Sequence, residues 1–298
     1  MDRSTRSAAC SWLEAGRAGI VVEVTEARGS VPRETGTRML VGLSSAAGTI
    51  GGGHLELQAI ARAREMLRTG EPAARTAHTA HTAQIAHYAL GPALGQCCGG
   101  AVTLRFAPLD SEAMACWPAA APRFHLQLFG AGHVGRAIAQ ALAPLDVVVD
   151  WIDERDDEFP TTFFEHGGVW PAHIRRVCVD AVEAEVRIAP PGAFFLVLTH
   201  RHDLDLRLTE AILKRGDFAF FGLIGSKTKR ARFVHALEAR GFEAERIARI
   251  TCPIGLDSIE GKEPAVIAAS VVAQLLAVRT APLSATTPPA PRLRALQT

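Results

Sequence analysis

A glycine-rich turn near the middle of the chain constrains the fold more than any other stretch. Residues 124–142 read FHLQLFGAGHVGRAIAQAL, which is an apolar run, a turn with Gly130, Gly132 and Gly135, and then apolar residues at helical spacing. In a strand–turn–helix unit the first glycine permits the turn, the second lets the backbone approach a phosphate, and the third lets helix and strand pack closely. The N–H groups at the helix start, around His133, then face a bound anion.

An acidic residue follows this turn at the distance that a nucleotide site requires. A second apolar strand, residues 147–152, ends at Asp153, at about the ~20-residue distance where Rossmann proteins carry the carboxylate that binds a ribose hydroxyl. A chance G-x-G-x-x-G pattern in a chain with 26 glycines is the alternative explanation. The order of strand, helix, second strand and acid favours a nucleotide-type Rossmann unit.

The C-terminal half of the chain continues this alternation of strands and helices. The apolar runs that we expect to form strands are residues 124–129, 147–152, 176–179, 194–199 and 218–224. The stretches that we expect to form helices are residues 133–143, 203–215, 226–240 and 263–279. Such alternation predicts a doubly wound parallel sheet of the α/β class, with ligands bound at the carboxyl ends of its strands.

Composition divides the chain into four parts. Residues 1–107 are expected to form a small mixed α+β domain, and residues 123–280 to form the Rossmann-type domain. The Pro- and Ala-rich residues 108–122 predict a linker, and the Pro-rich residues 281–298 predict a disordered tail. A chain of 298 residues with 48% hydrophobic content is long enough for two cores.

Charge and cysteine usage exclude several classes of protein. The 32 basic and 31 acidic residues give a net charge of +1, so nucleic acid is not a favoured partner. No apolar run approaches the ~20 residues of a membrane span, and the N-terminus predicts an amphipathic helix instead of a signal peptide. The six cysteines form neither a disulfide framework nor a CxxC zinc pattern, so we expect a cytoplasmic protein.

Two stretches of the N-terminal part resemble ligand-binding loops. Residues 48–54, GTIGGGH, precede an expected helix, and their glycines either expose N–H groups to an anion or form a plain connector. Cys97 and Cys98 lie in the glycine-rich segment 90–100, where small flexible neighbours favour an accessible, functional thiol over the usual buried cysteine.

Three histidines in the same half suggest a metal site at first sight. His78, His81 and His87 are three and six residues apart, which matches no standard closed site. The repeated TAHTAH composition favours a strand with surface histidines over a metal site.

Polar residues follow an expected strand at residues 197–205. His200 and Asp205 are candidates for acid–base chemistry in this stretch. Asp203 has a structural alternative, because it can cap the following helix.

A second strand end combines glycines with a basic cluster. Residues 222–232 hold Ser226 and four cations, among them Lys227 and Arg230, at the start of an expected helix. Cations oppose the helix dipole at that end. The cluster therefore predicts either a bound phosphate or a solvated basic face.

Taken in order, these motifs resemble those of the XdhC/CoxI family. The matching stretches are RGSVPRETGTRMLV (28–41), GTIGGGHLE (48–56), LGPALGQCCGG (90–100), LFGAGHVGRA (128–137), VLTHRHDLD (197–205), FGLIGSKTKRARF (221–233) and CPIGL…GKEPAVIAASVVAQLL (252–276). Together they cover most of residues 10–278, and their joint order is far more specific than any single motif.

The resemblance implies a maturation factor, and not a metabolic dehydrogenase. It implies a small N-terminal domain followed by a Rossmann domain, commonly as a homodimer, that binds the molybdenum cofactor (molybdopterin) and protects it. It further implies that a partner cysteine desulfurase replaces an oxo ligand of molybdenum with sulfido. The protein would then deliver the cofactor to the molybdenum subunit of an apo xanthine dehydrogenase.

The chemical groups of this cofactor have candidate partners in the matching motifs. Cys97 or Cys98 is expected to be a soft ligand for molybdenum or a sulfur-transfer site. The cofactor phosphate is expected either at the central glycine turn or at Ser226, Lys227 and Arg230. Four further residues are expected to line a cleft between the domains: His54, Glu56, Arg33 and His200.

Two positions fit the resemblance less closely. Arg201 stands where the family motif Thr-His-Asp-His has its aspartate, although His200, His202 and Asp205 match, which weakens a metal or acid–base role for this motif. Asp153 suits a ribose diol, which molybdopterin lacks. Either a nucleotide-bearing cofactor or an additional ligand such as NAD(P) binds there, or the residue is a relic of the fold.

Two other functions compete with the maturation factor. An NAD-dependent oxidoreductase would use His200 with Asp205 as its acid–base pair, but it leaves the GQCCGG segment unexplained. A nucleotide-sensing module without catalysis is supported mainly by Asp153.

Overall fold

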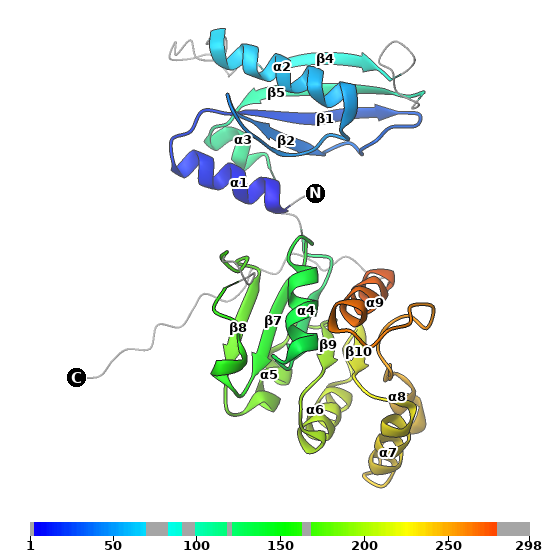
Figure 1. The fold of residues 1–298 in the computed structure, drawn as a ribbon. Coiled ribbons are helices and arrows are strands. Elements are labelled where there is room, and N and C mark those ends of the chain that lie inside the picture. Colours follow the sequence, from blue (N-terminus) through cyan, green and yellow to red (C-terminus); the bar gives the residue numbers. More distant parts are fainter. Residues whose placement is uncertain (1–2, 70–82, 91–98, 118–120, 163–167, 279–298) are drawn as a thin grey trace, which may run out of the picture. The chain divides into compact units, whose positions relative to one another are not determined.

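The structure, a computed structural model, describes residues 3–69, 83–90, 99–117, 121–162 and 168–278 (Figure 1). The chain divides into two compact units, Met1–Ala120 and Ala121–Thr298. Cys97, Cys98, His78 and His81 lie outside the described residues, as does the expected tail at 281–298.

The N-terminal unit is an antiparallel sheet with helices on both faces. Its elements are α1 (Arg3–Glu14), β1 (Ile20–Arg28), β2 (Arg38–Val41), β3 (Ala46–Gly48), α2 (Gly53–Thr69), β4 (Gln84–Ala89), β5 (Ala101–Pro108) and α3 (Ser111–Ala115). Within the described residues the strands pair in the order β3-β2-β1-β5-β4. Val22 of β1 packs with Leu55 of α2, and the next side chain back along the strand, Val21, packs with Trp12 of α1. Because side chains alternate along a strand, one apolar run supplies both cores.

The C-terminal unit is a parallel sheet of Rossmann type, as the sequence predicted. Its elements are β6 (His125–Phe129), α4 (His133–Leu142), β7 (Val148–Asp153), η2 (Asp156–Glu158), β8 (Ile174–Cys178), α5 (Val182–Ile188), β9 (Phe194–Val197), α6 (His202–Arg215), β10 (Phe220–Leu223), α7 (Lys227–Glu238), α8 (Ala244–Ala248) and α9 (Pro264–Ala277). In the described part the strand order is β10-β9-β6-β7-β8, and every pairing is parallel.

Helices cover both faces of this sheet (Figure 1). Helices α4 and α9 pack over one face, where Trp151 and Ile138 are buried. Helices α5, α6 and α7 pack over the other, where Ile152 and Leu208 are buried. The arrangement leaves the loops after β6, β7 and β9 together at the carboxyl edge of the sheet, where ligands of such folds bind.

The structure adds short helices that the sequence pattern did not predict. Helices α5 and α8 contain seven and five residues, too few for a 3.6-residue period to stand out. The stretch expected as a linker, residues 108–122, includes α3, whose cap is the Asp110 carboxylate accepting from the N–H of Ala113 at 2.7 Å. Trp117 in the same stretch is buried against Trp12 of α1. A helix cap and a large apolar side chain outweigh the Pro- and Ala-rich composition there.

Among the described residues, no helix is both long and apolar enough to cross a bilayer. The apolar helix α9 has 14 residues, against the ~20 that a span requires.

Candidate functional site

The glycine turn after β6 is held in place by backbone contacts. Gly130 adopts a φ of +118°, a conformation that favours glycine, and its N–H donates to the carbonyl of Ile152 at 2.8 Å. The indole N–H of Trp151 donates to the Gly130 carbonyl at 3.0 Å. These two hydrogen bonds fix the turn to β7.

The other two glycines of the turn have opposite surroundings. A Cβ at Gly135 would overlap the carbonyl oxygen of Gly130, so this position is filled by backbone. A Cβ at Gly132 would meet no atom within 4 Å, although the φ of −66° there suits any residue. Close packing therefore explains Gly135, and open space beside Gly132 is where a ligand could approach.

The start of α4 has an open N-terminal end. Gly132 is its N-cap and makes no side-chain capping hydrogen bond, and its first turn contains no acidic residue. His133, the first residue of the helix, is exposed. Because the first N–H groups of a helix have no partner within it and carry partial positive charge, this end suits a phosphate.

Asp153, at the end of β7, is saturated with protein donors. One carboxylate oxygen accepts from the Ala131 N–H at 2.7 Å and from the Arg155 guanidinium at 3.0 Å, and the other accepts from the Arg155 N–H and Nε, both at 3.0 Å. Burial alone would raise the pKa of Asp153, but these partners outweigh it and hold the pKa below its ordinary value. A carboxylate offers about four acceptor positions, so a ribose diol would have to displace Arg155.

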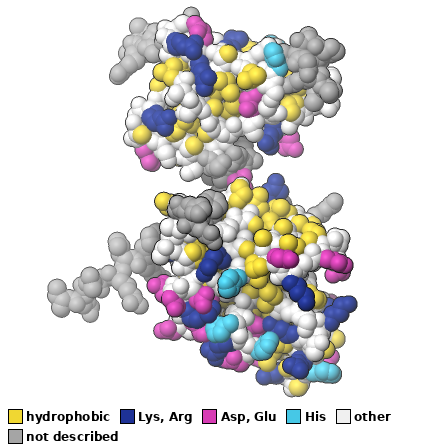
Figure 2. All heavy atoms as spheres, in the orientation of Figure 1, with side chains coloured by type: hydrophobic (Ala, Val, Ile, Leu, Met, Phe, Trp, Pro, Cys, Tyr) yellow, Lys and Arg dark blue, Asp and Glu magenta, His cyan; other side chains and the backbone are white. Residues whose placement is uncertain are grey.

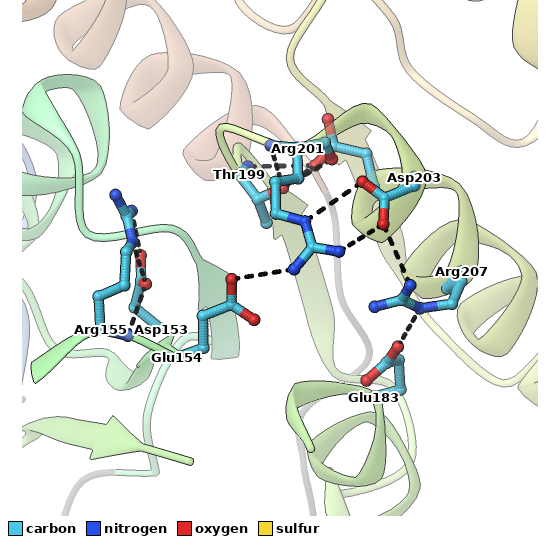
Figure 3. Close-up of polar contacts among 9 residues, drawn as sticks. Asp153, Glu154, Arg155, Glu183, Thr199, Arg201, Asp203 and Arg207 are labelled. Atoms are coloured by element: carbon cyan, nitrogen blue, oxygen red, sulfur yellow. Dashed lines mark hydrogen bonds and ion pairs between the residues drawn. The ribbon is translucent and has the colours of Figure 1, made fainter. Parts of the chain in front are cut away.

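A ladder of ion pairs runs from the end of β7 to α5 (Figure 3). Arg201 contacts Glu154 at 3.3 Å and Asp203 at 2.6 Å. Arg207 joins Asp203 at 3.2 Å to Glu183 of α5. Arg201, which stands in place of the aspartate of the family motif, therefore links the loop after β9 to Glu154, the residue directly after the end of β7.

A pocket lies at this edge, beside the glycine turn. It is lined by Phe129, Gly130, Ile152, Asp153, Glu154, Val182, Thr199, His200 and Leu204. Its cavity volume is about 10 Å³, room for about one water molecule, and it is partly open to solvent. The apolar lining residues Phe129, Ile152, Val182 and Leu204 are buried in the core, so the pocket is a small hollow at the edge of the sheet.

A buried ion pair joins the ends of β9 and β10, and sequence reasoning missed it. Asp205 is fully buried and accepts from Thr199 Oγ1 and from Lys229 Nζ, both at 2.6 Å. Lys229 also donates to the carbonyl of Ile224 at 2.7 Å. The spacing of Asp205 and Lys229, 24 residues apart, carries no signal in one sequence. The carboxylate is thus committed to Thr199 and Lys229 instead of pairing with the exposed His200.

The predicted basic cluster at α7 is therefore divided. Lys229 belongs to the buried pair, whereas Ser226, Lys227 and Arg230 are exposed. Ser226 caps the helix by accepting from the Lys229 N–H at 3.2 Å, and Arg230 donates to the Cys252 carbonyl at 3.4 Å. The cap satisfies part of the helix end that a phosphate would otherwise use.

In the N-terminal unit, the glycine loop before α2 is occupied by the chain itself. One oxygen of Glu56 accepts from the N–H groups of Ile50 and Gly52, both at 3.0 Å, and from the hydroxyl of Thr49. His54 and Arg33 are exposed. The anion expected for this loop is thus the carboxylate of Glu56.

The loops that carry the N-terminal motifs meet at one end of their sheet. Gly51 approaches Pro32 so closely that a Cβ would overlap the proline ring, and Gly100 packs against the carbonyls of Arg28 and Ser30. The Leu90 N–H donates to the Gly100 carbonyl at 2.7 Å. Segments 28–36, 48–53 and 99–100 therefore converge, and the last of these directly follows Cys98 in the sequence.

Metal coordination has no candidate cluster in the described ranges. No group of three or more His, Cys, Asp or Glu residues there is placed to hold an ion. His87 is exposed, with its Nδ1 3.0 Å from Thr103 Oγ1.

Together, fold and site define a two-unit α/β protein whose Rossmann unit presents a glycine-rich turn at the start of α4. Residues 126–275 match the family model described as the XdhC Rossmann domain, and residues 12–79 match the model of the XdhC and CoxI family. The chain belongs to the XdhC/CoxI family.

Two known proteins are similar over most of the chain. YqeB of Escherichia coli (strain K12), described as uncharacterized, is 31% identical over 264 residues, which is 87% of this chain and 43% of YqeB. The chain thus spans less than half the length of that relative. A solved Bacillus halodurans protein, named as a xanthine dehydrogenase, aligns with a TM-score of 0.71 and 17% identity over 92% of this chain and 95% of that one. At this identity the similarity shows a shared fold.

Proposed function

We propose that this protein binds the molybdenum cofactor, protects it and delivers it to the molybdenum subunit of an apo xanthine dehydrogenase. The observation that carries the proposal is the open space at Gly132 beside a helix start without a side-chain cap. In a member of the XdhC/CoxI family, the phosphate of molybdopterin is the anion that fits this turn.

Saturation of Asp153 supports a phosphate ligand over a ribose diol. Both of its oxygens hold Arg155, and one also holds the Ala131 N–H. A nucleotide-bearing cofactor or NAD(P) would need a different partner for its ribose. An NAD-dependent oxidoreductase is further disfavoured because Asp205, its expected acid–base residue, is held by Thr199 and Lys229.

The proposal assigns the thiols a part in cofactor maturation. Cys97 or Cys98 would act as a soft ligand for molybdenum or as a sulfur-transfer site while a partner cysteine desulfurase supplies the sulfido ligand. The convergence of segments 28–36, 48–53 and 99–100 supports a functional surface that includes the residues directly after Cys98 in the sequence.

The apolar surface of α4 and α9 supports a protein-binding face on the Rossmann unit. Figure 2 shows apolar side chains gathered over these helices. Leu276 of α9 is 41% exposed, and a helix that is apolar on all sides is normally buried. We propose that a second copy of the chain covers this face. Leu276→Glu should then shift the protein from dimer to monomer in analytical ultracentrifugation, and an unchanged sedimentation coefficient would contradict this assignment.

The function is tested by what the protein carries. It is purified from cells that make molybdopterin, and its bound pterin and molybdenum are assayed. We expect both in the wild-type protein, and less molybdenum or less sulfido ligand in Cys97→Ala or Cys98→Ala. Absence of pterin from every preparation would refute the chaperone function, whereas normal loading and sulfuration of both variants would refute only the role of the thiols.

A further inference from the structure

We propose that Arg155 is a specificity-determining residue that closes the glycine turn to nucleotides. Its guanidinium occupies the positions on the Asp153 carboxylate that the two hydroxyls of a ribose would take. The inference rests on the proposed function only for the natural ligand of the turn. Its physical basis is the hydrogen bonding of Asp153 and the ion pairs at the carboxyl edge of the sheet.

Asp153 stands where Rossmann folds carry their ribose-binding acid. It ends β7, the strand that follows the glycine turn and α4, and its carboxylate accepts from the Ala131 N–H of the turn at 2.7 Å. In nucleotide-binding members of this fold a carboxylate at this place binds the ribose while the turn binds the phosphates. The backbone therefore places an acid and a glycine turn as a nucleotide would require.

The acceptor positions of Asp153 are shared equally between the backbone and the Arg155 side chain. A carboxylate offers about four such positions, two on each oxygen. The N–H groups of Ala131 and Arg155 take one position on each oxygen, at 2.7 and 3.0 Å. The guanidinium takes the second position on each oxygen, through Nη2 and Nε, both at 3.0 Å. Two ribose hydroxyls would need these same two positions.

A second acid holds Arg155 in this place. Its Nη1 donates to Glu158 at 2.8 Å, so all three guanidinium nitrogens have a carboxylate partner. With the arginine in position, the Asp153 side chain is only 5% exposed. A group joined to its partner by a short connection competes at an effective concentration of about the mM range. A ribose would therefore have to displace a competitor that is always present.

Another arginine crosses the same edge of the sheet. Strand β6 lies between β9 and β7, and the strand order reverses between β9 and β6, where ligands of doubly wound sheets bind. Arg201 after β9 contacts Glu154 after β7 at 3.3 Å, so their ion pair spans the carboxyl end of β6 (Figure 3). The hollow that Gly130, Glu154 and Thr199 line there holds about 10 Å³, so a nucleoside finds no open space.

Removing the Arg155 side chain should turn this edge into a nucleotide site. Arg155→Ala keeps the backbone N–H of residue 155 and that of Ala131, so the carboxylate retains two donors and gains one free position on each oxygen. A hydrogen bond to a charged group changes an affinity by about ten-fold or more. Arg201→Ala should add to the effect, because it removes the ion pair across the edge.

The test measures binding of ADP and 2′-deoxy-ADP by isothermal titration calorimetry. The two probes differ in one ribose hydroxyl and share base and phosphates, so their comparison isolates the diol. The full-length protein is compared with Arg155→Ala and with Arg155→Ala/Arg201→Ala. The matched control is Arg175→Ala, which removes the arginine that donates at 2.7 Å to Asp150, another aspartate of β7.

One pattern of affinities is expected. The wild type and Arg175→Ala should bind both probes weakly and without distinction. Arg155→Ala should bind ADP about ten-fold more tightly than the wild type does, and about ten-fold more tightly than it binds 2′-deoxy-ADP. The double variant should bind ADP more tightly still.

Four results would overturn the role of Arg155: no gain in Arg155→Ala, an equal gain for 2′-deoxy-ADP, an equal gain in Arg175→Ala, or a wild type that binds ADP as tightly as Arg155→Ala. Equal affinity of the single and double variants would overturn the role of Arg201. Thermal unfolding checks that the variants are folded. Arg155→Gln, whose shorter side chain has one amide group, replaces Arg155→Ala if alanine prevents folding and is judged by the same comparisons.

These data separate the inference from the proposed function. If the purified wild type carries molybdopterin but Arg155→Ala gains no affinity for ADP, the role of Arg155 fails and the chaperone function stands. If Arg155→Ala gains diol-dependent binding but no preparation carries molybdopterin, the role of Arg155 stands and the proposed function fails.

Discussion

The two glycine-rich turns, residues 48–53 and 130–135, have similar compositions and different occupants. The first precedes α2, and Glu56 in its first helical turn accepts from the N–H groups of Ile50 and Gly52. The second precedes α4, which has no acidic residue in its first turn and no side-chain cap. The N-terminal turn therefore carries its own anion, and the C-terminal turn is available to a ligand.

The contrast between the two turns shows which residue to examine besides the glycines, namely the one four positions after the last residue before the helix. Glu56 lies four residues after Gly52, and the residue four after Gly132 is Arg136, which donates to the Glu158 carbonyl at 3.0 Å. A carboxylate in the first turn of a helix satisfies its N-terminal N–H groups, much as in a capping box. Its presence predicts a self-contained turn, and a turn without it keeps N–H groups that a ligand can use.

The largest effect is expected from Gly135→Ala. The new Cβ would overlap the Gly130 carbonyl oxygen, so α4 must move away from the turn. Overpacking costs about 1–3 kcal/mol and occasionally more, and a Cβ only 2.0 Å from a backbone oxygen belongs at the upper end of that range. Urea-induced unfolding should show this loss in the free energy of unfolding, and an unchanged midpoint would mean that the turn is not packed as described.

A smaller loss is expected from Glu56→Ala. Removing the carboxylate leaves two N–H groups and the Thr49 hydroxyl without their acceptor, which costs about 1–3 kcal/mol. Added sulfate should restore part of the midpoint by taking the place of the carboxylate. Glu56→Gln, which retains one acceptor oxygen, is the matched control and should lose less. No loss in Glu56→Ala would remove the contrast between the turns.

Acid should loosen the C-terminal turn through Asp153. Its pKa is lowered in the folded protein, so folding favours the ionised form. The resulting stability is present above the ordinary carboxyl pKa of about 3.9 and is lost as the pH falls through the lower, folded value. The free energy of unfolding of the wild type should therefore fall more steeply below about pH 4 than that of Asp153→Asn. Parallel pH profiles would contradict a stabilising role for the ionised carboxylate.

The smallest effect on stability is expected from Gly132→Val. The φ of −66° suits valine, and its Cβ meets nothing within 4 Å. The free energy of unfolding should change by less than ~1 kcal/mol, because surface changes away from strained positions are small. A large loss in the same urea experiment would show that the space beside Gly132 is structural.

Most of the fold followed from local sequence. The alternation of apolar strands and helices predicted the parallel sheet, and the glycine spacing identified the turn after β6. The short helices α5 and α8 were not predicted, because five to seven residues carry little periodicity. In the stretch expected as a linker, residues 108–122, the cap at Asp110 and the burial of Trp117 outweighed composition.

The site was less predictable because its decisive contacts join distant residues. Asp205 and Lys229 are 24 residues apart, and Arg201 and Glu154 are 47 apart. Saturation of Asp153 depends on Ala131, 22 residues away, and on Arg155, whose spacing of two residues does not by itself predict a bidentate pair. A single sequence names such residues but does not show which of their hydrogen-bonding positions are already filled.

The most direct test compares cofactor content in variants of the two turns. Wild type, Gly132→Val and Glu56→Ala are purified from cells that make molybdopterin, and molybdenum and pterin are measured per chain. We expect wild type and Glu56→Ala to carry similar amounts and Gly132→Val to carry about ten-fold less, because charge-assisted contacts to the phosphate are lost. Equal loading of Gly132→Val and wild type would contradict the assignment of the C-terminal turn as the phosphate site.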